Sequence, residues 1–184
     1  MTTIAVFGSS ISQPGSAEWI EGEALGRGIA ERGWAVATGG YGGTMEAVSA
    51  GAAHRGGHVI GVTAPAVFPA RSGANRHVDA EIVEPTISRR ITRLVEASDA
   101  VIALPGSIGT LAELVMAWNA SFVAQFSGSP ARPVVAVGPV WRAILDEIDL
   151  RLPTGGGIVR LTSSAAEALD VVDATIAPSK DLHI

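Results

Sequence analysis

The sequence predicts an α/β fold: a Rossmann-like, doubly wound and mainly parallel sheet of about six to seven strands with helices on both faces. Short apolar runs alternate along the chain with longer segments in which apolar residues recur at helical spacing. Glycine-rich or polar loops follow three of the expected strands, at the edge where such folds bind ligands. The chain has no repeat, low-complexity run or linker, so we expect residues 1–184 to form a single domain.

The first part of the chain predicts three strands, two helices and a long loop. Ser16 is placed to cap the first helix, and Gly33 suits the stop at its end. Residues 64–80 contain prolines and glycine without any period, which predicts a loop that acts as a lid or an interface segment. The expected elements are strands at 4–7, 34–37 and 58–62 and helices at 17–32 and 45–54. The residues of the first helix expected to reach the core are Trp19, Ile20, Leu25 and Ile29.

The second part predicts four more strands and four more helices. Pro85 separates a short strand from the next helix, which carries an apolar stripe on one face and charges on the other. The expected elements are strands at 81–84, 100–104, 134–137 and 158–161 and helices at 88–97, 108–126, 141–150 and from Ser163 or Ser164 to residue 176. The tail after Pro178 is expected to be loose.

Composition excludes several classes of protein. Hydrophobic residues make up 47% of the chain and charged residues 17%, which excludes a disordered chain. The net charge of −5 gives a nucleic acid no general attraction, so we expect no nucleic-acid partner. There are no cysteines, and the four histidines lack metal-ligand spacing, so no metal is expected. No run approaches about 18 apolar residues, and the chain begins without a leader-like segment, so we expect a soluble, cytoplasmic protein that does not bind a membrane.

The stretch Pro105–Glu113 is the strongest candidate for a functional site. It stands where a strand passes into a helix, and Gly106 and Gly109 allow a sharp turn and a close approach to a ligand. The start of a helix offers free N–H groups and a positive dipole end, which suits a phosphate, and the Thr110 hydroxyl can add to it. Glu113 follows one turn later, so an anion cradle and a carboxylate come close together.

A second glycine loop covers residues 39–44 and precedes another helix. It lacks the lysine of a Walker loop and does not match the dinucleotide motif. A tight turn that packs a helix on a strand is one interpretation; a phosphate or ribose site is favoured when both loops are considered together. The candidate ligand residues here are Gly40, Gly42, Gly43 and Thr44. Glu46 is the second candidate after Glu113 for acid–base work, although either carboxylate can equally be an ordinary helix residue.

Four further candidates come from the first loop and from the helix before the Pro105 stretch. Gly8 and Ser9 follow the first strand, and Ser9 can donate a hydrogen bond to a bound nucleotide. Arg90 lies beside the apolar stripe of its helix, so it can point inward, where it needs an anion such as a substrate phosphate. Ser88 is expected to cap that helix or to touch a ligand, whereas Arg89 and Arg93 suit a solvated face with an ion pair to Glu96.

The same residues resemble a known family. An arginine-containing helix start followed by Pro-Gly-Gly-x-Gly-Thr-x-x-Glu is the pattern of the Lonely Guy family, and the chain is similar to it over about residues 4–137. The stretches that carry the resemblance are Ser88–Arg90, Ser98–Leu104, Pro105–Glu113, Ala5–Ser10 and Gly39–Thr44. Ser107 stands in place of the second glycine of the motif, and it is retained as a ligand-binding candidate.

The resemblance implies a Rossmann-like nucleotide-binding domain, a homodimer or higher homo-oligomer, and no cofactor. It implies a hydrolase that cuts the N-glycosidic bond of a nucleoside 5′-monophosphate, AMP or an N6-modified AMP, to give free base and ribose 5-phosphate. By position, the catalytic residues of the family correspond to Arg90 and Glu113, and its phosphate loop corresponds to Gly106, Gly109 and Thr110.

Two alternatives remain at this point. The 39–44 loop is also similar to that of molybdenum cofactor carrier proteins, which share the fold and bind an anionic pterin without chemistry. A non-catalytic carrier or sensor of a phosphorylated ligand is therefore the second hypothesis. The third, a DNA-processing relative of this fold class, is disfavoured by the acidic charge.

Overall fold

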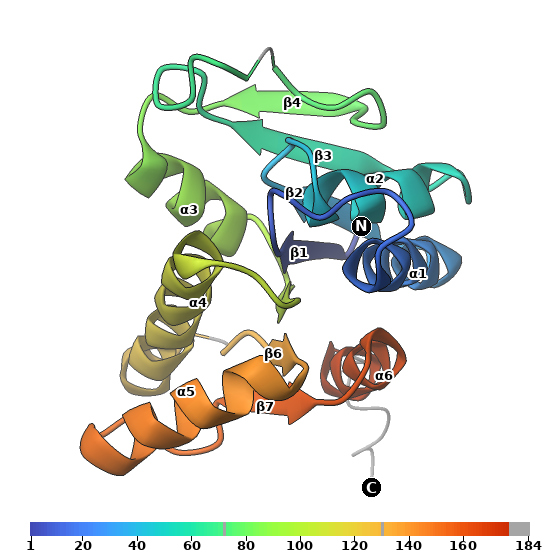
Figure 1. Cartoon of the computed structure of the whole chain (residues 1–184). Coiled ribbons are helices and arrows are strands. Elements are labelled where there is room, and N and C mark those ends of the chain that lie inside the picture. Colours follow the sequence, from blue (N-terminus) through green and yellow to red (C-terminus); the bar gives the residue numbers. More distant parts are fainter. Residues whose placement is uncertain (72, 130, 177–184) are drawn as a thin grey trace, which may run out of the picture.

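The structure is a computed structural model, and it describes residues 1–71, 73–129 and 131–176. Seven strands form one sheet in the order β4-β3-β2-β1-β5-β6-β7, and every neighbouring pair is parallel (Figure 1). The strands are β1 (Thr3–Phe7), β2 (Ala35–Thr38), β3 (Val59–Thr63), β4 (Ala80–Val83), β5 (Ala100–Ala103), β6 (Val134–Val137) and β7 (Val159–Thr162). The predicted α/β class and the parallel sheet are confirmed.

Helices cover both faces of the sheet (Figure 1). One face is covered by α1 (Ala17–Glu31), α2 (Thr44–Ala53) and α6 (Ala165–Ile176). The other is covered by α3 (Ile87–Glu96), α4 (Ile108–Ser127) and α5 (Pro139–Arg151). No helix in the described part of the chain is long and apolar enough to cross a membrane. The expected tail after Pro178 lies outside the described residues.

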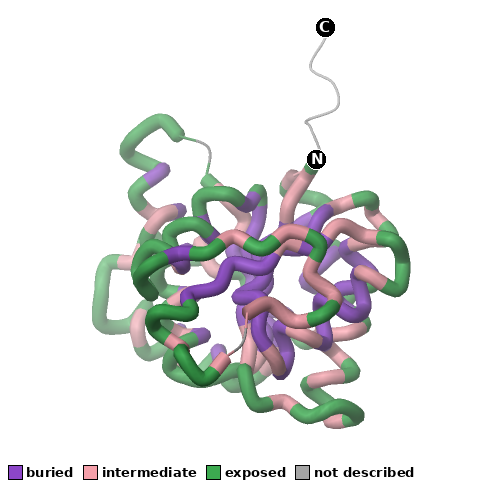
Figure 2. Tube along the Cα trace, turned by 90° about the horizontal axis from the view of Figure 1, so that it is seen from above, coloured by how far each residue is buried: buried purple, intermediate pink, exposed green. Residues whose placement is uncertain are grey.

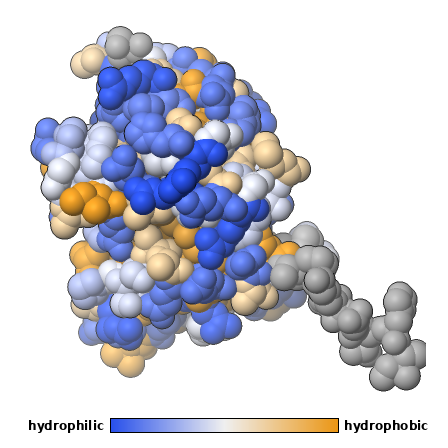
Figure 3. Space-filling model, turned by 90° about the vertical axis from the view of Figure 1, so that its right-hand side faces the viewer, coloured by the Kyte–Doolittle hydropathy of each residue, from blue (hydrophilic) through white to orange (hydrophobic). Residues whose placement is uncertain are grey.

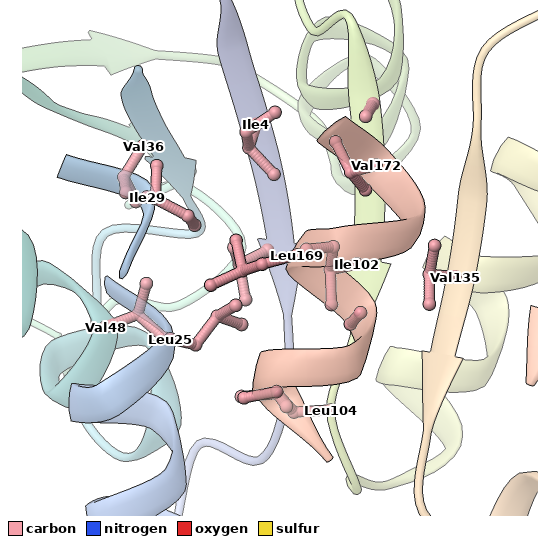
Figure 4. Close-up of a cluster of buried hydrophobic side chains, with 14 of the residues drawn as sticks. Ile4, Leu25, Ile29, Val36, Val48, Ile102, Leu104, Val135, Leu169 and Val172 are labelled. Atoms are coloured by element: carbon pink, nitrogen blue, oxygen red, sulfur yellow. The ribbon is translucent and has the colours of Figure 1, made fainter. Parts of the chain in front are cut away.

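Each face of the sheet has its own apolar core. The alternation of side chains along a strand sends neighbouring residues to opposite faces, so Ile4 belongs to one cluster and Ala5 to the other. Figure 4 shows Leu169 and Val172 of α6 packed beside Ile4 and Ile102. The central strands β2, β5 and β6 are accordingly buried throughout, and the exposed trace lies in the outer helices, the loops and the edge strands β4 and β7 (Figure 2).

Local signals in the sequence explain most element boundaries. The Ser16 hydroxyl accepts a hydrogen bond from Trp19 N (3.2 Å) and so caps α1, as predicted. Gly33 has a φ of +72°, which is why the chain can turn there. Ile20, predicted as a core contact, is 58% exposed. The inward face of α1 instead carries Gly26, where a Cβ would lie 2.0 Å from Val48 O, so the crossing with α2 is too close for a larger residue.

The helix α3 begins differently from the prediction. Its cap is Thr86, whose side chain accepts from Arg89 N (3.2 Å), and Ser88 lies exposed in the first turn. Arg93 forms its ion pair with Glu84 (3.0 Å) rather than with Glu96, because the end of β4 lies beside this face of the helix. Both the cap residue Thr86 and the ion-pair partner Glu84 therefore lie in the short segment between β4 and α3.

The order of the strands fixes where a ligand can bind. After β1 the chain builds the sheet outward through β2, β3 and β4, and then returns to place β5 on the other side of β1. In sheets of this kind, ligands bind in the crevice outside the carboxyl ends of the strands at this point of reversal. Because β2, β1 and β5 are neighbours, the three loops predicted to share one edge do so.

Candidate active site

A buried ion pair joins helices α3 and α4 at the candidate site. Arg90 of α3 and Glu113 of α4 lie with Nη1 and Oε1 3.1 Å apart, and their side chains are only 6% and 12% exposed. Arg90 Nε also donates to Val62 O (2.8 Å) at the end of β3. One guanidinium therefore links α3, α4 and the carboxyl edge of the sheet. Arg90 points inward as predicted, and the anion that it meets is the Glu113 carboxylate, whereas the sequence had suggested a substrate phosphate.

The path of the guanidinium requires glycine at position 39. A Cβ on Gly39 would lie 1.6 Å from Arg90 Nη2, so any larger residue would displace the guanidinium. On its other side, Arg90 lies over the ring of Tyr41, with Cζ 5.6 Å from the ring centroid. Gly39 and Tyr41 were not predicted as site residues, because their place within the glycine loop is the only signal that the sequence carries for them.

Burial changes the acidity of Glu113. Removal from water disfavours the charged carboxylate and raises the pKa of Glu113 to about 7, while the charge and the hydrogen bond of Arg90 act in the opposite direction. A carboxyl group that titrates near neutral pH can both accept and release a proton under physiological conditions. Buried, paired and perturbed carboxylates are enriched at functional sites, although structural ion pairs share these properties.

The loop after β5 borders a cavity at the point where the sheet reverses. Ser107 is the cap of α4, and its hydroxyl accepts from Gly109 N (3.4 Å). A Cβ on Gly106 would lie 2.1 Å from Thr110 Oγ1, so the turn is packed against the first turn of α4 and Thr110 is buried. A cavity of about 490 Å³ lies between this loop and the loop after β1; its lining includes Ser9, Ser12, Gln13, Gly106 and Ser107.

The predicted ligand residues of the 39–44 loop act chiefly as packing residues. Gly43 has a φ of +71°, and a Cβ there would lie 2.4 Å from Ser9 O. Thr44 is buried; its N donates to Ser9 O (2.8 Å), and its hydroxyl lies 2.9 Å from the Ser12 hydroxyl. A Cβ on Gly8 would lie 2.7 Å from Thr44 Cγ2. This loop therefore positions the loop after β1 against α2.

A second cavity of about 540 Å³ lies on the other side of the loop after β1. It is lined by Ser10, Tyr41, Gly42, Glu46, Ala70, Arg71, Gly73, Ala74, Asn75 and Arg76. Its outer wall comes from the long β3–β4 loop (the 64–79 loop), which the structure describes at residues 64–71 and 73–79 and which lies against the 39–44 loop. Asn75 holds the two together, because its N donates to Gly40 O (2.6 Å) and its Nδ2 donates to Gly40 O and Tyr41 O, both at 3.1 Å.

The structure brings most of the predicted residues to one edge of the sheet but divides them among three places. Ser9, Gly106 and Ser107 line the first cavity, and Gly8, Gly109 and Thr110 lie next to them in the chain. Gly40, Gly42 and Gly43 lie in the second loop, and Thr44 and Glu46 lie in the first turn of α2. Arg90 and Glu113 form the buried pair, which is not among the residues that line either cavity. Ser88 lies apart from them on the surface of α3. Among the residues that the structure describes, no group of three or more His, Asp or Glu side chains can hold a metal ion.

Comparisons with known proteins agree with this architecture. The model of the SLOG cluster4 family matches residues 1–125. A protein of Mycobacterium tuberculosis named cytokinin riboside 5′-monophosphate phosphoribohydrolase is 37% identical over 139 residues, which cover 74% of this chain and 71% of that protein. The protein of the same name from Mycobacterium marinum is 33% identical over 157 residues, or 82% and 77% of the two chains.

A solved structure resembles the whole fold. The molybdenum cofactor binding protein of the phototrophic bacterium Rippkaea orientalis superposes with a TM-score of 0.77 at 26% identity, covering 96% of this chain and 98% of that one. The expected resemblances to the Lonely Guy family and to molybdenum cofactor carriers are therefore both confirmed.

Replacement of Arg90 tests the electrostatics of the pair. Because Arg90 lowers the pKa of Glu113 against the effect of burial, Arg90→Gln is expected to raise that pKa above 7, as measured by carboxyl-carbon NMR across pH 4–9. Arg93→Gln on the same helix serves as the control, since Arg93 pairs with Glu84 instead. A pKa of Glu113 that is unchanged or lower in Arg90→Gln would contradict the assigned contact.

Proposed function

The chain belongs to the SLOG cluster4 family, and we propose that it hydrolyses the N-glycosidic bond of a nucleoside 5′-monophosphate to free base and ribose 5-phosphate. The observation that carries the proposal is the buried Arg90–Glu113 pair, which supplies a carboxylate of raised pKa at the ligand-binding edge of the sheet. Two relatives at 37% and 33% identity that bear a phosphoribohydrolase name support it.

The 5′-phosphate is assigned to the first cavity. The first turn of α4 presents backbone N–H groups and the positive end of its dipole there, and Ser107 and Gly106 line the cavity wall. The turn is narrow because Gly106 packs on Thr110, so backbone rather than side chains faces the ligand. The lining also includes the Glu18 carboxylate, so the attraction for an anion comes from the turn at the start of α4 and not from the protein's net charge of −5.

In the proposed reaction the bond between C1′ and the base nitrogen breaks while water adds to C1′. The departing base leaves positive charge on the ribose, which an ionised Glu113 stabilises. Glu113 then takes a proton from the attacking water, and this proton is available to the base that leaves. Arg90 holds the carboxylate in place through its 3.1 Å contact and keeps a share of it ionised against the effect of burial.

The second candidate is a non-catalytic carrier of a phosphorylated ligand such as molybdenum cofactor. It is favoured by the solved structure of a molybdenum cofactor binding protein, which superposes on nearly the full chain. The two functions differ in one measurable respect: an enzyme releases free base from a nucleotide, whereas a carrier binds its ligand and returns it unchanged.

A homodimer is part of the proposal, and helix α4 supplies the reason. One side of this 20-residue helix exposes a row of large apolar side chains: Ile108, Val115, Met116, Val123 and Phe126. An apolar cavity of about 290 Å³ adjoins it, lined by α4 and α5 residues such as Trp118 and Ile148. Continuous apolar surface of this kind marks interfaces. The opposite side of the molecule, by contrast, is mostly hydrophilic (Figure 3). A cytoplasmic location is part of the same proposal.

Loss of the Glu113 charge tests the catalytic role. Glu113→Gln keeps the shape of the side chain but removes the base and the negative charge, so kcat/KM for the best purine nucleoside 5′-monophosphate is expected to fall by roughly 10²-fold or more. Release of base and ribose 5-phosphate is followed by chromatography, with the exposed Glu147→Gln as control. Equal rates for Glu113→Gln and the parent would refute the role; binding without base release would favour the carrier.

Disruption of the apolar row tests the dimer. Phe126 is 75% exposed on α4, so Phe126→Asp is expected to shift the molar mass in light scattering from that of a dimer to that of a monomer. Ile20→Asp, at a 58% exposed position on α1, provides the matched control and should leave the dimer intact. A parent chain of monomer mass at micromolar concentration would rule the dimer out.

A further inference from the structure

The second cavity is lined by a carboxylate, Glu46, and a guanidinium, Arg71, that have no part in the proposed hydrolysis. Arg71 comes from the 64–79 loop and lies over two rings, with Cζ 4.7 Å from the centroid of Tyr41 and 4.5 Å from that of Phe68. Because the two rings stand at 77° to each other, the guanidinium sits in the corner between them, where cation–π contacts with both rings hold it in place. Glu46 enters the same cavity from the first turn of α2.

The carboxylate of Glu46 lies above a turn that leaves it room. A Cβ on Gly42 would make an ordinary van der Waals contact with Glu46 Oε2 at 3.8 Å, so the carboxylate lies directly beside this turn and the turn does not crowd it. Within the described residues, neither Glu46 nor Arg71 has a hydrogen-bonded side-chain partner or an ion pair, with each other or with a third group. Both charges thus line one cavity of about 540 Å³ with their hydrogen-bonding capacity unused.

Hydrogen bonds attach the loop that carries Arg71 to the 39–44 loop at two places. Ala64 N donates to the Tyr41 hydroxyl (2.8 Å) at one end, and Asn75 binds the carbonyls of Gly40 and Tyr41 at the other. Tyr41 is itself buried and meets Phe68 edge-to-face at 5.7 Å. Arg71 is therefore held against Tyr41 and Phe68 in the wall of the cavity that Glu46 also lines, and such pre-organisation favours recognition of a ligand.

We propose that this cavity binds the base of the substrate and that it selects guanine over adenine; this inference rests on the proposed nucleotide hydrolysis. The edge of guanine presents N1–H and the 2-amino group as donors next to O6 and N7 as acceptors. A carboxylate accepts from the two donors, and a guanidinium donates to O6 and N7 in the bidentate manner that arginine uses to read guanine in DNA. Glu46 and Arg71 supply this pair.

Adenine presents the opposite pattern to the same two side chains. Its N1 is an acceptor, which faces the carboxylate of Glu46, and its 6-amino group is a donor, which faces the guanidinium of Arg71. A polar site built for one pattern rejects the other because its own groups are left unpaired. Arg76 at the rim of the cavity adds a further cation, which also favours the carbonyl of guanine.

The position of this cavity suits a base whose phosphate occupies the first one. Ser9 lines the first cavity and Ser10 lines the second, so the loop after β1 forms a wall common to both. Tyr41, which lies under Arg71, also lies over the guanidinium of Arg90. A nucleotide that places its phosphate at Ser107 and its base at Arg71 therefore crosses the edge of the sheet on which the Arg90–Glu113 pair stands.

The experiment compares GMP, IMP and AMP as substrates of the full chain. The cavity predicts kcat/KM in the order GMP, IMP, AMP, with at least about tenfold between the first and the last, because IMP lacks only the 2-amino group that Glu46 accepts from. Glu46→Gln and Arg71→Gln are each expected to reduce the GMP-to-AMP ratio at least about fivefold. The charge controls are Glu147→Gln and Arg142→Gln, two exposed positions on α5.

Failure of the proposal is distinguishable from failure of the proposed function. A preference for AMP would overturn the guanine assignment. It would also be overturned if Glu46→Gln lowered the rates for GMP and AMP equally and left their ratio unchanged, and this result would return Glu46 to a general acid–base role. If no nucleotide is cleaved, the hydrolase is refuted, and calorimetric affinities for GMP and AMP decide the assignment instead. Tighter binding of GMP that is weakened by Arg71→Gln supports it, and equal affinities overturn it.

Discussion

The contact between Arg90 and Glu113 is the constraint on which the ligand-binding edge of this protein depends. A buried cation needs a partner, and Arg90 finds two of them, the Glu113 carboxylate at 3.1 Å and the Val62 carbonyl at 2.8 Å. Removal of either charge would leave the other buried and alone, which costs about 3–5 kcal/mol in comparable pairs. Helices α3 and α4 are thereby held to the end of β3, and Gly39 must remain without a side chain to admit the guanidinium.

The same contact explains how the site can carry out chemistry. Burial alone raises the pKa of a carboxyl group, and a neutral carboxyl would neither stabilise positive charge on ribose nor activate water. Arg90 opposes that effect, so the pKa of Glu113 stands at about 7 and a substantial ionised fraction is present at neutral pH. Around this centre, the switch in strand order between β1 and β5 opens one cavity, and the β3–β4 loop closes the other. The strand order thus places the Arg90–Glu113 pair and both cavities at the same edge of the sheet.

Much of this arrangement could be predicted from the sequence because it is local. Periodicity located every strand and helix to within about two residues, and the apolar stripe of α3 indicated that Arg90 points inward. Contacts between distant segments were beyond such reasoning. The ion pair of Arg93 with Glu84, and the place of Arg71 over Tyr41, arise only when β4 and the 64–79 loop fold back on the sheet. Likewise, no local pattern distinguished Thr86 from Ser88 as the cap of α3.

The dependence of hydrolysis on pH tests the role of the buried pair most directly. If ionised Glu113 is the reacting group, kcat/KM for the preferred purine nucleoside 5′-monophosphate rises with pH and levels off above about 7, since the raised pKa of Glu113 lies there. The slope should be tenfold per pH unit on the acid side, and it should vanish in Glu113→Gln. A rate that is level from pH 5 to 9, or one whose bend persists in Glu113→Gln, would contradict the account.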